Sequence, residues 1–187
     1  MKLNTKTFMA IFIAVIMISS VLGFVFTFSP HSTGGAERIE FQNYVFVETH
    51  QGWMGFDDNE NQILLSSDPR TVSTIQVPEI SLVELNSANK VYVTSNPEDN
   101  LQNSAAYFEA NIRPRLKSYL PACSADVKGC ENAPLIDCSN ALPATKVIQV
   151  ALSNQSSVTY NNNCLLVQGN RFQVPLIFDA LILKLSS

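Results

Sequence analysis

The sequence predicts a mixed α/β (α+β) protein, in which an N-terminal transmembrane helix precedes one small exported domain, a β-hairpin then β-α-β-β-α. Three observations lead to this prediction. A run of 21 residues, positions 8–28, contains no charged side chain. All four cysteines follow that run. Beyond it, short β-branched and aromatic segments alternate with two stretches of helical periodicity. The length of 187 residues fits one domain with an appendage.

Residues 8–28 are long enough to cross a bilayer as a helix, which needs about 20 apolar residues. Lys2 and Lys6 precede them, and the first acidic residue is Glu37. The positive-inside rule therefore places residues 1–7 in the cytoplasm and the rest outside. A cleaved signal peptide is one alternative, but its apolar region usually covers about 7–15 residues. A buried core helix is another, which the position behind two lysines disfavours. We expect a single-pass anchor in the cell membrane, a stalk at 29–37 and an extracytoplasmic domain at 38–187.

The charge balance disfavours nucleic acid as a partner, because nucleic-acid binding needs a basic surface. The net charge is −4, from 12 basic and 16 acidic residues. Since Lys2 and Lys6 are two of the 12, the exported part carries 10 basic against 16 acidic residues. The expected partners are the membrane, through the N-terminal helix, and another envelope protein.

The exported part begins with segments typical of a β-hairpin or meander. Strands are predicted at residues 41–47, 52–56 and 62–65, with a polar turn at 57–61 before the last of them. The aromatic residues here could form a sugar-stacking platform, although such residues on strands are more often core. They are Phe41, Tyr44, Phe46, Trp53 and Phe56.

The middle and C-terminal parts predict a strand at 90–95, a helix and then two or three further elements. Apolar residues recur at helical spacing from Leu101 to Leu116, and Pro114 should kink or break that helix. Strands follow at 146–152 and within 157–168, where the second segment holds one strand or two. Residues 175–185 predict a buried helix, too short to span a bilayer.

The cysteines indicate disulfides, because an even number lies in a compartment where disulfides persist. Four cysteines allow three pairings; the one preferred joins Cys123 to Cys130 and Cys138 to Cys164. Their spacing is not that of a zinc ribbon, and C-x-x-C is absent.

No other motif predicts a catalytic, cofactor or metal site. P-loop, dinucleotide-binding, zincin and nucleophile-elbow patterns are absent. His31 and His50 lack neighbours that would complete a catalytic set. The acidic turn 57–60 lacks EF-hand spacing and is interpreted as solvated rather than calcium-binding. Asn154 begins a sequon, Asn-Gln-Ser, and is a candidate glycosylation site.

Three stretches together carry a resemblance: residues 41–46 with Gln51-Gly52-Trp53, residues 123–138, and residues 160–169. The chain resembles small, uncharacterised single-pass or exported proteins of archaea. The resemblance implies an archaeal envelope protein with its four cysteines outside, and it supplies no catalytic residue. The sequence thus favours a non-enzymatic, membrane-anchored binding or assembly module without cofactors. The alternative is an extracytoplasmic thiol–disulfide oxidoreductase, suggested by the cysteines and a thioredoxin-like order of elements.

Overall fold

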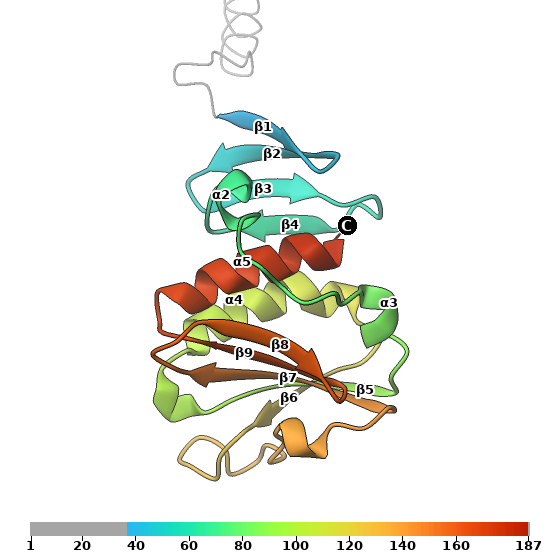
Figure 1. Cartoon of the computed structure of the whole chain (residues 1–187), viewed down its shortest axis with the longest axis vertical. Coiled ribbons are helices and arrows are strands. Elements are labelled where there is room, and N and C mark those ends of the chain that lie inside the picture. The colour runs from blue at the N-terminus through green and yellow to red at the C-terminus, as the bar shows by residue number, and fades with distance from the viewer. Residues whose placement is uncertain (1–36, 187) are drawn as a thin grey trace, which may run out of the picture. The chain divides into compact units, whose positions relative to one another are not determined.

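The computed structural model describes residues 37–186, which form a mixed α/β domain with two sheets and four α-helices (Figure 1). The expected span at 8–28 and His31 lie outside the described residues. Within the described part, no helix is both long and apolar enough to cross a bilayer.

The first sheet, called here the N-terminal sheet, is an antiparallel meander in the order β1-β2-β3-β4. Its strands are β1 (Arg38–Phe41), β2 (Tyr44–Thr49), β3 (Gly52–Phe56) and β4 (Gln62–Leu65). The bounds of β3 and β4 confirm the two later predicted strands. The single strand predicted at 41–47 is wrong, because the chain reverses at Gln42 and Asn43 inside it.

The reversal is a two-residue hairpin loop whose central residues both have positive φ, 49° at Gln42 and 70° at Asn43. That geometry suits the right-handed twist of the flanking strands, and asparagine tolerates it better than most residues. The hairpin between β8 and β9 has the same kind of two-residue loop, with Asn162 at φ 49° and Asn163 at φ 65°. Aromatic and β-branched residues surround positions 42 and 43, so the sequence pattern indicated one continuous strand and not a turn.

The second sheet, called the C-terminal sheet, has the order β6-β5-β7-β9-β8. Its first four strands in that order run parallel, and β8 pairs antiparallel with β9 at one edge. The strands are β5 (Lys90–Ser95), β6 (Tyr119–Cys123), β7 (Thr145–Leu152), β8 (Ser157–Asn161) and β9 (Cys164–Gly169).

The order β-α-β-β-α therefore needs correction to β5-α4-β6-β7-β8-β9-α5. The strand β6 is missing from the prediction because Pro121 interrupts its apolar residues. Proline lacks an N–H and is accepted on an edge strand, which is the position β6 occupies.

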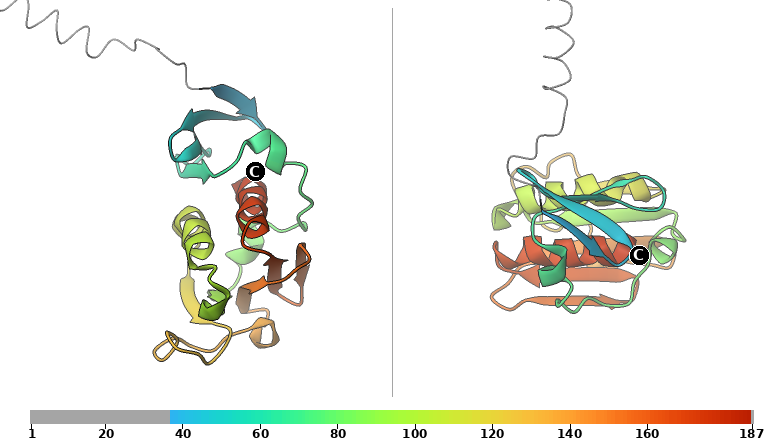
Figure 2. Two further views of the ribbon diagram at one scale, coloured as in Figure 1. Left: turned by 90° about the vertical axis from the view of Figure 1, so that its left-hand side faces the viewer. Right: turned by 90° about the horizontal axis from the view of Figure 1, so that it is seen from above.

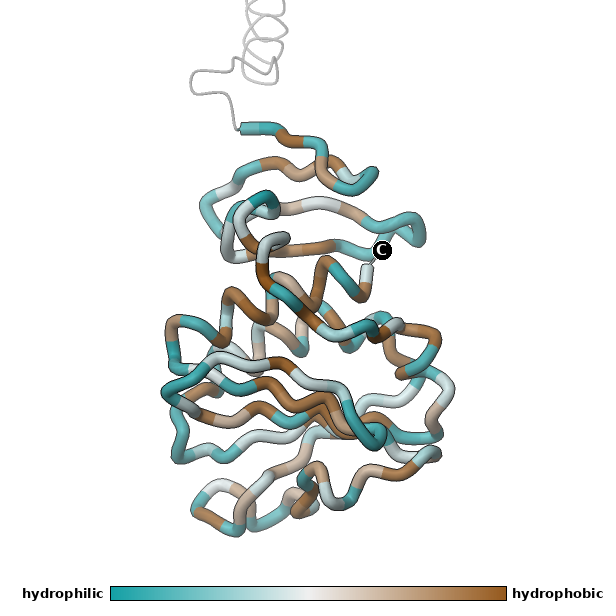
Figure 3. Tube along the Cα trace, in the orientation of Figure 1, coloured by the Kyte–Doolittle hydropathy of each residue, from teal (hydrophilic) through white to brown (hydrophobic). Residues whose placement is uncertain are grey.

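Helices α4 (Gln102–Ile112) and α5 (Gln173–Ser186) lie side by side between the two sheets (Figure 2). The rings of Phe108 and Phe178 stack between them with centroids 4.5 Å apart. As predicted, α4 ends before Pro114, which lies in the 3₁₀ turn η2 (Arg113–Arg115). Apolar residues gather along α5 and the central strands of the C-terminal sheet, where the core lies (Figure 3).

Short helical turns complete the described domain. They are α2 (Pro69–Val72), α3 (Leu82–Leu85), η1 (Pro97–Asp99) and η3 (Cys138–Asn140).

Candidate functional site

The four cysteines form two disulfides, Cys123–Cys130 and Cys138–Cys164, with Cα–Cα distances of 6.0 and 5.3 Å. This is the preferred one of the three pairings. Cys123, Cys130 and Cys164 are buried, at 7%, 3% and 4% exposure. The sulfur atoms therefore sit in packed surroundings, which suits a structural role.

The disulfide-bonded segment 123–144 packs on the sheet face opposite the helices. Thr94 Oγ1 donates to the carbonyl of Ile136 at 2.8 Å, and the amide of Cys138 donates to Gln149 Oε1 at 2.9 Å. Both polar side chains extend from central parallel strands, β5 and β7. The bridges and these hydrogen bonds hold the segment over a sheet face on which no α-helix of residues 37–186 packs.

The N-terminal sheet has two edges, and side chains of the helical layer close one of them. On β4, the amide of Leu64 donates to Asn111 Oδ1 at 2.9 Å, and Tyr107 Oη donates to the carbonyl of Leu64 at 2.7 Å. Arg115 Nη2 donates to the carbonyl of Gln62 at 3.0 Å. Backbone groups that would otherwise face outward from this edge are thus satisfied by residues of α4 and η2.

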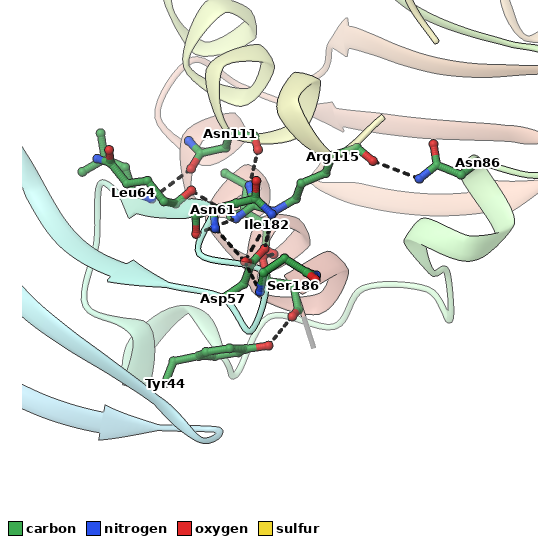
Figure 4. Close-up of polar contacts among 11 residues, drawn as sticks. Tyr44, Asp57, Asn61, Leu64, Asn86, Asn111, Arg115, Ile182 and Ser186 are labelled. Atoms are coloured by element: carbon green, nitrogen blue, oxygen red, sulfur yellow. Dashed lines mark hydrogen bonds and ion pairs between the residues drawn. The ribbon is translucent and has the colours of Figure 1, made fainter. Parts of the chain in front are cut away.

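A buried ion pair between Asp57 and Arg115 is part of the contacts that close the β4 edge (Figure 4). Nε of Arg115 lies 3.1 Å from Oδ2 of Asp57, and their side chains are 2% and 6% exposed respectively. Arg115 also donates to the carbonyl of Asn111. Burial alone would raise the pKa of Asp57, but hydrogen bonds from Asn61 and Arg115 outweigh it and hold that pKa below its ordinary value.

The interpretation of residues 57–60 as a wholly solvated turn is therefore wrong for Asp57. Its Oδ1 accepts hydrogen bonds from the amides of Asn59 and Asn61 at 2.9 and 2.8 Å, which shapes the β3–β4 turn. Asp58, Asn59 and Glu60 are exposed, as expected. No group of three or more potential metal-ligating side chains occurs among residues 37–186.

A second buried acid, Asp179 of α5, holds the residue that follows β4. It is fully buried and accepts hydrogen bonds from Ser66 Oγ at 2.7 Å and from the Ser66 amide at 3.1 Å, and it shares the single hydroxyl proton of Tyr107 with the carbonyl of Leu64. Burial raises the pKa of Asp179 above its ordinary value, although the hydrogen bonds oppose the shift. Burial and the neighbouring Asp179 raise the pKa of Tyr107 as well.

The other edge of the N-terminal sheet, strand β1, remains open within the described domain. The amide of Glu48 donates to the carbonyl of Glu37 at 2.8 Å, so the pair 37–48 is hydrogen-bonded. Because hydrogen-bonded and non-hydrogen-bonded pairs alternate, the backbone groups of Ile39 and Phe41 face β2. Those of Arg38 and Glu40 face outward.

The face of the same sheet that points away from the core is more apolar than a solvated face usually is. Tyr44, Phe46 and Trp53 point to the core, whereas Phe56 is 58% exposed on the opposite face. The aromatic residues therefore do not share one sugar-stacking surface. Other apolar side chains on that opposite face are partly exposed: Val45, Val47, Met54 and Leu64.

A cleft of about 450 Å³ lies beside the buried ion pair. Asp57, Arg115 and Asn86 contribute its polar lining, and the 82% exposed side chain of Val83 contributes an apolar part. Both charges of the ion pair are already engaged with each other and with backbone groups. The cleft therefore adds accessible surface but offers no unused charge from this pair.

The remaining predicted positions lie apart from these features. Asn154 is exposed in the turn between β7 and β8, a position that a glycosylation site requires. His50 is exposed in the β2–β3 turn. The sequence prediction missed the closed β4 edge, although Arg115 beside Pro114 and the isolated acid Asp179 in an apolar helix were signals that could have indicated it.

Comparisons with family models, with curated proteins and with solved structures find no match to this chain. The resemblance to archaeal envelope proteins accordingly stays a prediction.

Proposed function

We propose that the protein is a membrane-anchored binding or assembly module of the cell envelope, with its domain outside the cytoplasm. The observation that carries the proposal is the asymmetry of the N-terminal sheet. Its β4 edge is closed by side chains of α4 and η2, whereas no described residue pairs with the outward backbone groups of β1, which lie next to a partly apolar face. An open sheet edge is a common docking site for another chain.

The placement of that edge in the sequence supports the same function. The proposed span ends at residue 28 and β1 starts at Arg38. A stalk of nine residues reaches at most about 30 Å when fully extended. The N-terminal sheet would consequently be held close to the membrane, where neighbouring envelope proteins are concentrated.

The disulfides support an exported location and a structural role for the cysteines. Both bridges form between residues on the far side of the proposed span, in the compartment where such bonds persist. Burial of the sulfurs at Cys123, Cys130 and Cys164 favours stable bridges over reactive thiols.

Membrane fractionation with mass spectrometry of the full chain tests the proposal. We expect an intact N-terminus, retention in membranes after alkaline extraction, and digestion of the domain by protease added from outside. A mature N-terminus near Phe24 or Glu37 would overturn the anchor. A thiol that reacts rapidly under native conditions would instead favour the oxidoreductase.

A further inference from the structure

The exposed edge of β1 carries one basic and one acidic residue, so that its charges complement those of an antiparallel copy of the same strand. Its outward-facing backbone groups belong to Arg38 and Glu40, which are exposed and flank the inward-facing Ile39. Neither charged side chain forms an ion pair with another residue of the described domain. The neighbouring Arg70, in contrast, binds Glu37 at 2.8 Å.

An antiparallel copy of the same strand matches this edge in one register. With Ile39 opposite Ile39 of the second copy, Arg38 lies opposite Glu40 of the second copy, and Glu40 lies opposite Arg38 of the second copy. In this register the outward-facing N–H and C=O groups of residues 38 and 40 meet their counterparts, so both pairs are hydrogen-bonded. The arrangement has two-fold symmetry and places opposite charges face to face twice.

We propose that two copies of this protein associate through β1 in that register, which joins their N-terminal sheets into one continuous sheet. The inference rests on the proposed function and names the partner of its open edge: a second copy of this chain.

The charges explain why the partner is a copy rather than any extended segment. Charged residues on an exposed edge disfavour indiscriminate strand pairing. Arg38 and Glu40 disfavour an apolar strand and a parallel in-register copy, which would set like charges side by side. The antiparallel copy is the arrangement in which both charges are neutralised and both sets of backbone groups are paired.

The contact involves only the four residues of β1, so association in dilute solution should be weak. Confinement to a membrane raises the effective concentration of the second copy without adding any contact. The anchor and the open edge therefore work together: the first concentrates the chains and the second orients them.

Charge reversal tests the register in the full-length protein. Copies carry a donor or an acceptor dye on a C-terminal tag, and energy transfer is measured in proteoliposomes over a range of protein-to-lipid ratios. R38E or E40R alone places like charges opposite each other twice. We expect each to weaken self-association about tenfold, since each of two favourable cross-strand pairs becomes unfavourable.

Three combinations distinguish this register from general surface charge. R38E mixed with E40R restores both opposite-charge pairs, as does the double variant R38E/E40R with itself. The double variant mixed with the wild type again opposes like charges and should associate weakly. K128E, an exposed charge reversal in the segment closed by Cys123–Cys130, is the matched control and should associate like the wild type.

Restored transfer in the mixture also shows that the single variants are folded. The proposal is overturned if wild-type transfer does not exceed that expected for randomly distributed chains, or if R38E and E40R associate as the wild type does. Fractionation of the same full-length protein separates the two proposals. A membrane-retained, externally exposed chain without charge-dependent pairing would leave the proposed function standing and remove the second copy as its partner.

Discussion

Replacing Arg115 by methionine should lower the free energy of unfolding by about 3 kcal/mol. The substitution leaves Asp57 in a buried position without its cation, and breaking a buried ion pair from one side typically costs about 3–5 kcal/mol. Asp57 keeps hydrogen bonds from Asn59 and Asn61, so we expect the lower end of that range. Backbone carbonyls of Gln62 and Asn111 also lose a donor.

For a domain of this size, a loss of about 3 kcal/mol corresponds to a fall in melting temperature of about 6–12 °C. The measurement is thermal and urea unfolding of oxidised protein beginning at Glu37, at neutral pH. Arg113 supplies a matched control, because its side chain is 67% exposed and contacts Glu109 at 3.4 Å. Arg113→Met should change the unfolding free energy by no more than about 0.5 kcal/mol.

A double-mutant cycle separates the ion pair from the packing of the arginine stem. Asp57→Asn removes the charge that Arg115→Met leaves unpaired, so the combined variant should be more stable than the sum of the two losses predicts. If Arg115→Met costs less than about 1 kcal/mol, or if the two losses simply add, the ion pair does not hold the β4 edge as we infer.

Three further predictions concern the buried acid, the hairpin and the bridges. Because burial raises the pKa of Asp179, its contribution to stability is greatest below pH about 3.8 and falls as pH rises through the higher folded value. Asp179→Asn should therefore gain stability relative to the wild type as the pH rises above about 3.8, as difference melting curves will show. Asn43→Val should cost about 1–2 kcal/mol at φ 70°, whereas Asn43→Gly should be nearly neutral in urea unfolding. Removing the bridge Cys138–Cys164 should destabilise by about 1 kcal/mol more than removing Cys123–Cys130, since the sequence separations are 26 and 7; equal melting temperatures would contradict this ordering.

Local signals in the sequence were enough to locate much of the fold. Alternating apolar residues and turn residues placed the strands at 52–56, 62–65 and 90–95 correctly, and Pro114 marked the end of α4. Cysteine spacing favoured the pairing that the structure has. Each of these signals acts over a few neighbouring residues or reflects simple loop closure.

Where the local signal was ambiguous, the tertiary structure decided. The aromatic run at 41–47 suits one strand or two, and pairing of β1 with β2 selects the turn at Gln42 and Asn43. Pro121 interrupts the apolar residues of β6, a strand that the sequence prediction lacked, and the edge of the C-terminal sheet accepts the proline.

The sequence by itself determined most of the helices and strands, the acidic balance after residue 28 and the even number of cysteines. Tertiary structure alone determined the turn at Gln42 and Asn43, which polar groups are buried and, among the described residues, which sheet edge is open. Asp57 pairs with Arg115 at a sequence separation of 58 residues, and Asp179 hydrogen-bonds to Ser66 at a separation of 113. No periodic pattern links residues so far apart, because their contact depends on how whole elements pack. The same packing places Arg38 and Glu40 on β1, an edge strand of the N-terminal sheet, which is why we propose that their charges direct assembly.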